Sequence, residues 1–117
     1  MKRPLPAASH SRDIDPVSLR LFLAALEEGS LARAAARENI VPSAVSKRMI
    51  EMEEVLGVPL LARDVKGVQA TPAGQALAEH ARRVLQQMER MHREMAAFAT
   101  GVRGAHPAGG QRGGAVG

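Results

Sequence analysis

Four residues near the middle of the chain combine hydroxyl and cationic side chains within six positions. They are Ser43, Ser46, Lys47 and Arg48, and they follow Pro42 at the start of a stretch with helical periodicity. Hydroxyls donate and accept hydrogen bonds, while Lys and Arg bind phosphate oxygens and acceptor atoms on base edges. A helix N-terminus also carries partial positive charge. The cluster therefore predicts contact with a polyanion such as nucleic acid.

Three further cations are candidates for the same chemistry. Arg63 and Lys66 border a predicted turn between two short apolar segments, and Arg33 lies in the preceding helical region. Asp64 is a possible surface partner for Arg63, and such exposed pairs contribute little. Considered alone, all of these cations are also compatible with a solvated surface.

Catalytic and metal-binding patterns are missing from the sequence. His80 and His92 are twelve positions apart on one predicted helix, without an acid–histidine zinc signature between them. The chain has no cysteine, no Gly-x-Ser-x-Gly motif and no glycine-rich phosphate loop. We therefore expect no enzyme activity, no cofactor and no metal site.

The composition favours a small helical protein with a local basic patch. The 117 residues have room for one compact domain, and their only aromatic residues are Phe22 and Phe98. A core of aliphatic side chains favours packed helices. The net charge of +4 comes from the flanks, because residues 13–100 contain 11 Lys and Arg against 12 Asp and Glu. A surface that binds a polyanion must then be a cluster on a nearly neutral domain.

The two ends differ in composition from the central region. Residues 1–12 lack apolar periodicity and residues 100–117 are rich in glycine, so both are predicted to be unstructured tails. Residues 13–71 are predicted to form one domain, and residues 72–99 a helix that continues from it. No long uncharged apolar stretch predicts a membrane span or a secretory signal, so a cytoplasmic protein is expected.

Capping residues divide the central region into four helices and a hairpin. Prolines after Asp15 and Thr71 mark helix starts, whereas Gly29 and Gly57 mark helix ends. The predicted helices run from Pro16 to the stop at Gly29, from the cap at Ser30 to about Glu38, from Pro42 or Ser43 to about Leu56, and from Pro72 to about Ala99. Between the last two, Leu60–Arg63 and Val68–Ala70 are predicted to be the strands of a small hairpin.

The third predicted helix has two faces. Its inward positions are predicted to be Val45, Met49 and Met52, and its outward positions include Ser43, Ser46, Lys47 and Arg48.

The last predicted helix carries a regular apolar seam. Its members are Leu77, Ala81, Val84, Met88, Met91, Met95 and Phe98. The steps alternate between four and three residues, which is typical of a coiled coil. At about 1.5 Å per residue the helix is roughly 42 Å long, more than the small domain can cover. A second copy of the chain is expected to pack on it, although the methionines alone would also suit a copper site or a peptide groove.

The second and third predicted helices, joined by a tight turn, have the arrangement of a helix-turn-helix, and the hairpin after them is placed as a wing. The predicted fold is therefore mainly α: a winged helix-turn-helix of three helices and a β-hairpin, followed by a long dimerisation helix. Seven segments also match, in order and spacing, those of LysR-type bacterial transcription regulators. They are Leu19-Arg20-Leu21-Phe22, Glu28-Gly29-Ser30-Leu31, Arg33-Ala34-Ala35, Ser43-Ala44-Val45-Ser46, Glu53-Glu54-Val55-Leu56-Gly57, Leu60-Leu61-Ala62-Arg63 and Thr71-Pro72-Ala73-Gly74. On these segments the chain resembles the N-terminal part of such a regulator over roughly residues 17–98.

The resemblance implies a transcription regulator that binds double-stranded DNA as a homodimer. It implies that Ser43, Ser46, Lys47 and Arg48 lie on the recognition helix and that Arg63 contacts phosphate from the wing, with Arg33 and Lys66 as secondary contacts. Two-fold symmetry of the dimer implies a pseudo-palindromic operator.

The chain departs from the family pattern at three points. Pro42-Ser43 stands where many members have Gln-Pro, so a base contact from that Gln is not expected. Glu38 replaces a usual Leu, which requires that Glu38 lie at the rim or that Val41 take the packing role. No effector-binding domain is recognised, so no small-molecule inducer is expected. Two alternatives stay open: a modulator that forms mixed dimers with a full-length relative, and a non-specific DNA-coating protein.

Overall fold

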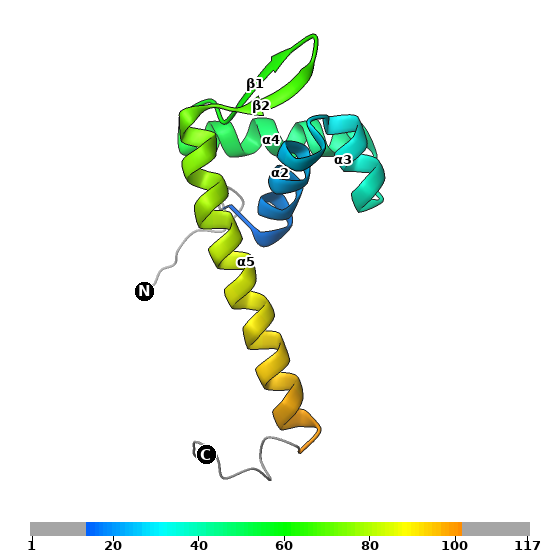
Figure 1. The fold of residues 1–117 in the computed structure, drawn as a ribbon, viewed down its shortest axis with the longest axis vertical. Coiled ribbons are helices and arrows are strands. Elements are labelled where there is room, and N and C mark those ends of the chain that lie inside the picture. Colours follow the sequence, from blue (N-terminus) through cyan, green and yellow to red (C-terminus); the bar gives the residue numbers. More distant parts are fainter. Residues whose placement is uncertain (1–13, 102–117) are drawn as a thin grey trace, which may run out of the picture. The chain divides into compact units, whose positions relative to one another are not determined.

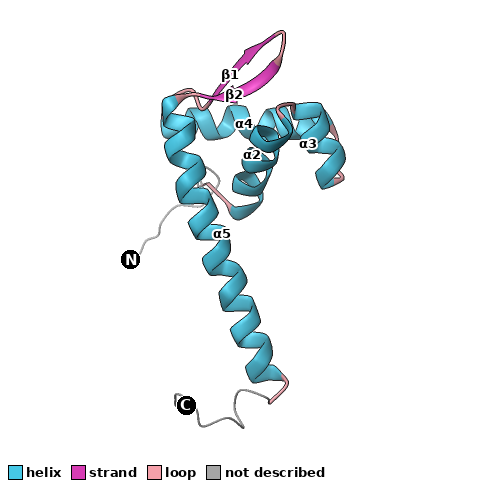
Figure 2. Ribbon diagram, in the orientation of Figure 1, coloured by secondary structure: helices cyan, strands magenta, loops and turns pink. Residues whose placement is uncertain are grey.

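The computed structural model describes residues 14–101 (Figure 1). The predicted tail at 1–12 and nearly all of the one at 100–117 lie outside these residues. The elements, in chain order, are α2 (Pro16–Glu28), α3 (Leu31–Glu38), α4 (Pro42–Leu56), β1 (Leu61–Asp64), β2 (Gly67–Ala70) and α5 (Pro72–Ala99) (Figure 2). The predicted fold class, helices with one small hairpin, is confirmed.

Side-chain caps start three of the helices, as predicted. The Asp15 carboxylate accepts the backbone N–H of Ser18 at 2.7 Å. The hydroxyls of Ser30 and Thr71 each accept the N–H of the residue three positions later, at 3.1 and 3.0 Å. The turn after α3 is made by Asn39, whose φ of 66° lies in the left-handed region that Asn tolerates better than most residues. These local signals explain why the predicted helix boundaries agree with the observed ones.

The chain divides into two compact units within α5, between Arg83 and Val84. In the first unit α2 contacts α3, α4 and β2, and α3 contacts α4. The largest fully buried side chains are Phe22, Met49, Leu60 and Val45. The inward positions predicted for α4 are confirmed, because Val45, Met49 and Met52 are all buried. This packing fixes which face of α4 remains exposed.

The hairpin is antiparallel and is anchored to the end of α2. Asp64 lies opposite Gly67, and β1 begins one residue later than predicted. The backbone N–H of Val68 donates to the Gly29 carbonyl oxygen at 3.1 Å, and the Val68 side chain is buried. A Cβ at position 67 would collide with that same carbonyl, so the close approach requires glycine.

Glu53 joins the end of α4 to the start of the hairpin. Its Oε2 accepts the backbone N–H groups of Leu60 and Leu61 at 2.8 and 3.1 Å. A carboxylate that accepts two backbone N–H groups forms stronger bonds than neutral acceptors do. The sequence analysis did not identify this role.

We expect Gly74→Ala to destabilise the first unit although alanine is the better helix former. A Cβ at Gly74 would collide with the backbone carbonyl oxygen of Leu60. Forcing a methyl group into such a contact costs about 1 to 3 kcal/mol, which exceeds the gain in helix propensity. Thermal unfolding followed by circular dichroism measures the change. The matched control is Gly57→Ala, where a Cβ meets nothing within 4 Å and only the left-handed φ of 74° is unfavourable. If Gly74→Ala is more stable than the wild type, the close approach of Gly74 to the Leu60 carbonyl oxygen is wrong.

In the second unit, the described residues continue α5 as a regular helix to Ala99. Four seam residues in this part have 43 to 53% of their surface exposed; they are Val84, Met91, Met95 and Phe98. Met88 is partly buried. Ala81, which belongs to the first unit, is fully buried within the single chain. Its inclusion in an exposed seam is therefore corrected: Ala81 packs inside its own chain.

Candidate nucleic-acid interface

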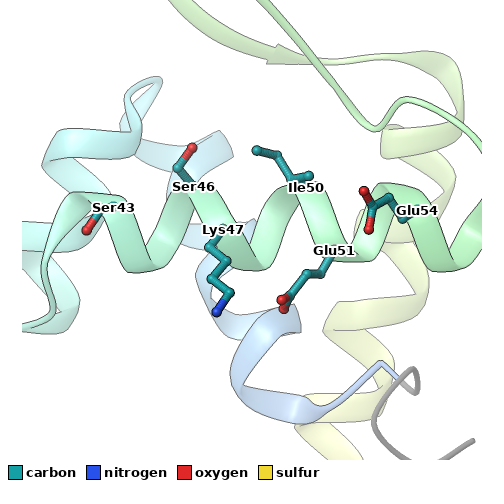
Figure 3. A pocket seen from close by; sticks show the side chains of 6 residues that line it. All are labelled: Ser43, Ser46, Lys47, Ile50, Glu51 and Glu54. Atoms are coloured by element: carbon teal, nitrogen blue, oxygen red, sulfur yellow. The ribbon is translucent and has the colours of Figure 1, made fainter. Parts of the chain in front are cut away.

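The exposed side of α4 forms a shallow recess of about 470 Å³. Its lining, called the recognition face below, consists of Ser43, Ser46, Lys47, Ile50, Glu51 and Glu54 (Figure 3). Within residues 14–101 none of these side chains forms a hydrogen bond or an ion pair. Three of them, Ser43, Ser46 and Lys47, come from the sequence-predicted cluster. Their polar atoms are therefore available to a ligand.

The recognition face has two edges. Ser46 and Ile50 point to one side of α4, and Lys47 and Glu51 point to the other (Figure 3). Ser43 lies in the first turn of α4, where no side chain caps the helix. The N-terminal half of the face thus presents hydroxyls and an ammonium group, and the second half presents two carboxylates. Phosphates would be attracted only to the first half.

Arg48 points away from this face. Its Nη1 lies 3.3 Å from Asp15 Oδ2 and 3.2 Å from the Ser18 hydroxyl oxygen, at the start of α2. The outward position expected for Arg48 is therefore corrected. Position 48 comes one residue after Lys47, which turns its side chain by about 100° around the helix, toward α2. Arg48 holds α4 against α2.

The same contacts affect the ionisation of Asp15. The backbone N–H of Ser18 donates to its carboxylate, and the Ser18 hydroxyl and the Arg48 guanidinium add to this effect. Together they outweigh partial burial and lower the pKa of Asp15 below its ordinary value of 3.8. The charged form is thus favoured in the folded protein.

We expect Asp15→Ala to lower the free energy of unfolding by about 0.5 to 2 kcal/mol at pH 7, because it removes a helix cap. Since folding lowers this pKa, the contribution of Asp15 is fully present well above pH 3.8 and is lost as the pH falls through the folded-state value. Urea unfolding at pH 7 and pH 3 should therefore give a smaller difference at pH 3. Asp15→Asn keeps a cap but loses the charge. Its free energy of unfolding at pH 7 should lie between those of the wild type and Asp15→Ala. If Asp15→Ala lowers the free energy of unfolding equally at both pH values, the lowered pKa of Asp15 is wrong.

The wing carries two further candidate cations. Arg63 lies on β1 and Lys66 in the turn before β2, and both are exposed. Neither side chain forms an ion pair within the described residues. Asp64 instead accepts the backbone N–H of Lys66 at 2.8 Å, so it shapes the turn. Arg63 does not pair with Asp64, so within residues 14–101 its guanidinium has no carboxylate partner.

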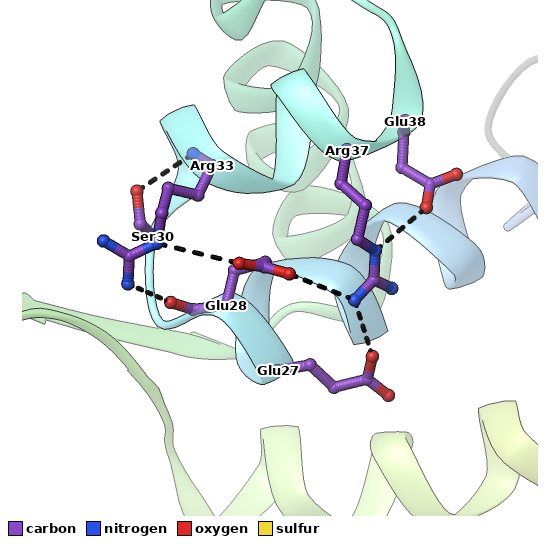
Figure 4. Close-up of polar contacts among 6 residues, drawn as sticks. All are labelled: Glu27, Glu28, Ser30, Arg33, Arg37 and Glu38. Atoms are coloured by element: carbon purple, nitrogen blue, oxygen red, sulfur yellow. Dashed lines mark hydrogen bonds and ion pairs between the residues drawn. The ribbon is translucent and has the colours of Figure 1, made fainter.

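Arg33 and Arg37 belong to a network of ion pairs with glutamates at the junction of α2 and α3 (Figure 4). The Arg33 guanidinium donates to the carbonyl oxygen of Glu28 and lies 3.7 Å from its carboxylate. Arg37 lies 2.9 Å from Glu27 Oε1, 3.4 Å from Glu28 and 3.3 Å from Glu38. The hydrogen bonds that Arg37 donates, to Glu27 first and then to Glu38, raise the pKa of Arg37 above its ordinary value. These carboxylates partly neutralise both arginines, whereas Lys47 has no carboxylate partner within residues 14–101.

The structure decides between the two expectations for Glu38. The Glu38 side chain is 25% exposed and pairs with Arg37, so it lies at the rim. Val41 is 62% exposed and does not take a packing role. The acid in place of a leucine is accommodated by an ion pair.

The described part of the chain offers neither a metal site nor a membrane span. Residues 14–101 contain no group of three or more His, Cys, Asp or Glu side chains arranged to hold a metal ion. No helix within those residues is long and apolar enough to cross a membrane.

A short helix, a left-handed turn and a second helix with an exposed polar face form the helix-turn-helix of this chain. Residues 17–75 match the model of the bacterial regulatory helix-turn-helix proteins of the lysR family. The chain belongs to the LysR family.

Among curated proteins, this LysR-family chain is 47% identical over 68 residues to the HTH-type transcriptional regulator TfdS of Cupriavidus pinatubonensis. It is 40% identical over 68 residues to the regulator TcbR of Pseudomonas sp.. Each match covers 58% of this chain but only 23% of the relative. The chain thus spans less than a quarter of the length of these relatives.

Solved structures give the same result for the fold. The CbnR_DBD–DNA complex shares 35% identity at a TM-score of 0.70, and the match covers 74% of this chain and 99% of that one. The BenM_DBD/catB site 1 DNA complex shares 31% identity at a TM-score of 0.73, with coverage of 75% and 99%. The LysR-family chain therefore carries the DNA-binding helix-turn-helix domain of a transcription regulator.

Three residues of the recognition face in this LysR-family domain were missed by the sequence analysis. They are Ile50, Glu51 and Glu54. The signal that finds them is periodicity, because positions 50 and 54 lie one and two turns beyond Ser46. The cations of this face stand out in the sequence, whereas its apolar and acidic side chains do not.

Proposed function

We propose that the chain binds double-stranded DNA sequence-specifically through the recognition face of α4 and regulates transcription as a homodimer. The observation that carries this proposal is the set of unpartnered polar groups on the second helix of a helix-turn-helix. Ser43, Ser46 and Lys47 have no partner within residues 14–101, whereas the neighbouring Arg48 is used internally. Side chains left free on an otherwise packed helix are available for an intermolecular contact.

The residues take different parts in this interaction. Ser46 and Lys47 reach base edges in the major groove, and Ser43 contacts phosphate at the uncapped start of α4. Arg63 and Lys66 contact the backbone beside the recognition site. Arg33 adds a weaker contact, because Glu28 partly neutralises it. Arg48 is a positioning residue that holds α4 against the start of α2.

A second copy of the chain is the proposed partner of α5. Val84, Met91 and Met95 are 43 to 53% exposed and follow heptad spacing on one stripe of the helix. Such a stripe is covered when two copies pack side by side. With two-fold symmetry, each α4 then meets one half of a pseudo-palindromic operator.

Selection of bound duplexes from a random library tests the proposal. The full chain should enrich a two-fold symmetric motif, and binding to it should exceed binding to scrambled duplexes by at least about 1,000-fold at fixed salt. Uniform binding without enrichment would instead indicate a DNA-coating protein. Enrichment that appears only after a full-length relative is added would indicate a mixed-dimer modulator.

A further inference from the structure

Ile50 is an apolar side chain in the middle of an otherwise polar recognition face. It is 48% exposed and lies one helical turn after Ser46, and both side chains point to the same side of α4 (Figure 3). The buried residues of α4 are Val45, Met49 and Met52, so Ile50 is not needed for the core. Its position suits a ligand that Ser46 also contacts.

The charges around Ile50 determine which part of a duplex can approach it. Glu51 and Glu54 line the same recess and have no cationic partner within residues 14–101. A phosphate close to these carboxylates would be repelled, because like charges a few ångströms apart interact unfavourably even near a protein surface. The second half of the recognition face must therefore lie over bases and not over the DNA backbone. Carboxylates tolerate this environment, since cytosine and adenine present amino donors in the major groove.

The major groove offers one prominent apolar group, the 5-methyl of thymine. We propose that Ile50 contacts a thymine 5-methyl group and so makes one position of each half-site specific for thymine. This inference depends on the proposed DNA-binding function. Four residues of helix advance about 6 Å and base pairs are about 3.4 Å apart, so the thymine should lie one to two base pairs from the base that Ser46 contacts.

Deoxyuridine substitution tests the contact directly, because it removes only the methyl group from thymine. On the selected operator, each thymine is replaced in turn by deoxyuridine, symmetrically in both half-sites. Wild-type affinity should fall about fourfold per half-site at one position and little elsewhere. Ile50→Ala should bind the unmodified operator more weakly than the wild type does. Deoxyuridine at the thymine that Ile50 contacts should then have no further effect on affinity.

Two controls keep the test independent of folding and of the proposed function. Ile50→Ala should melt within a few degrees of wild type, because the side chain is half exposed. Ile50→Val, which keeps the branched Cβ and removes only the terminal methyl group, should retain part of the deoxyuridine effect. A flat wild-type profile, or an unchanged profile in Ile50→Ala, would overturn the thymine contact while sequence-specific binding stands. Failure of the wild-type chain to select any operator would instead overturn the proposed function.

Discussion

Lys47→Ala should reduce affinity for the selected operator by about 5- to 150-fold for each half-site of the dimer without unfolding the domain. The range corresponds to about 1 to 3 kcal/mol for each contact between Lys47 and a base. Lys47 makes no ion pair within the described residues, so its removal costs the fold little. If Lys47 binds phosphate instead, the variant dimer neutralises two fewer phosphates, and the slope of log affinity against log salt should fall by about 2. Fluorescence anisotropy at several salt concentrations separates these cases.

Arg48→Ala is the matched control, because it removes a cation from the adjacent position. Arg48 contacts Asp15 and Ser18, so its removal should lower the melting temperature by a few degrees and leave the salt slope unchanged. A protein in which Arg48→Ala changes the salt slope and Lys47→Ala does not would reverse the assignment of the two residues.

Replacing Val84 and Met91 together by Glu should convert the dimer into monomers. The two positions are one heptad apart on the exposed stripe of α5 and are 43 and 45% exposed. Four carboxylates would then enter the dimer interface, and the desolvation cost is on the order of several kcal/mol. Operator affinity should fall by about 100-fold or more, because the two half-sites no longer bind as one unit. Analytical ultracentrifugation and anisotropy measure the two effects.

The control for this variant places Glu at Gln86 and Arg93, also one heptad apart. Both residues are exposed, and Arg93 forms only an exposed pair with Glu89 at 3.6 Å. This control adds more negative charge than the seam variant does. If both variants become monomeric, charge alone explains the result. If the wild-type chain is monomeric at tens of micromolar, the homodimer proposal fails.

Most of the fold could be predicted because its boundaries are set by local chemistry. Asp15 and Thr71 each combine an N-cap with a proline at the next position, and Gly57 ends α4 in a left-handed conformation. Such signals act within a few residues and do not depend on tertiary packing. The apolar periodicity then identifies the buried face of α4, which is why Val45 and Met49 were assigned correctly.

The parts that were missed depend on contacts distant in sequence. Arg48 turns inward because Asp15, 33 positions away, lies beside it. Glu53 could not be identified as the partner of the Leu60 and Leu61 amides, because that contact requires the chain to fold back after α4. Ala81 has the spacing of a seam residue but is covered by its own chain. Spacing on one helix does not reveal what packs against it.

Ion pairing separates the cations of the candidate interface into two groups. The Arg33 and Arg37 cations are paired with carboxylates, whereas Lys47, Arg63 and Lys66 have unpaired side chains within residues 14–101. Among the candidate site residues, the cations that no carboxylate neutralises within these residues thus lie on α4 and the wing. The expectations for the tails and for the absence of an inducer stay predictions, since they concern residues outside 14–101.

Site-directed cleavage of the operator tests most directly whether α4 lies in the groove. The natural chain has no cysteine, so Ser43→Cys provides one unique attachment point for an iron chelate that cleaves nearby DNA. Glu79→Cys, exposed on α5, is the control. If α4 lies in the groove, cleavage is expected from position 43 within each half-site of the selected operator and none there from position 79. Cleavage from position 79 inside the half-sites, with none from position 43, would contradict it.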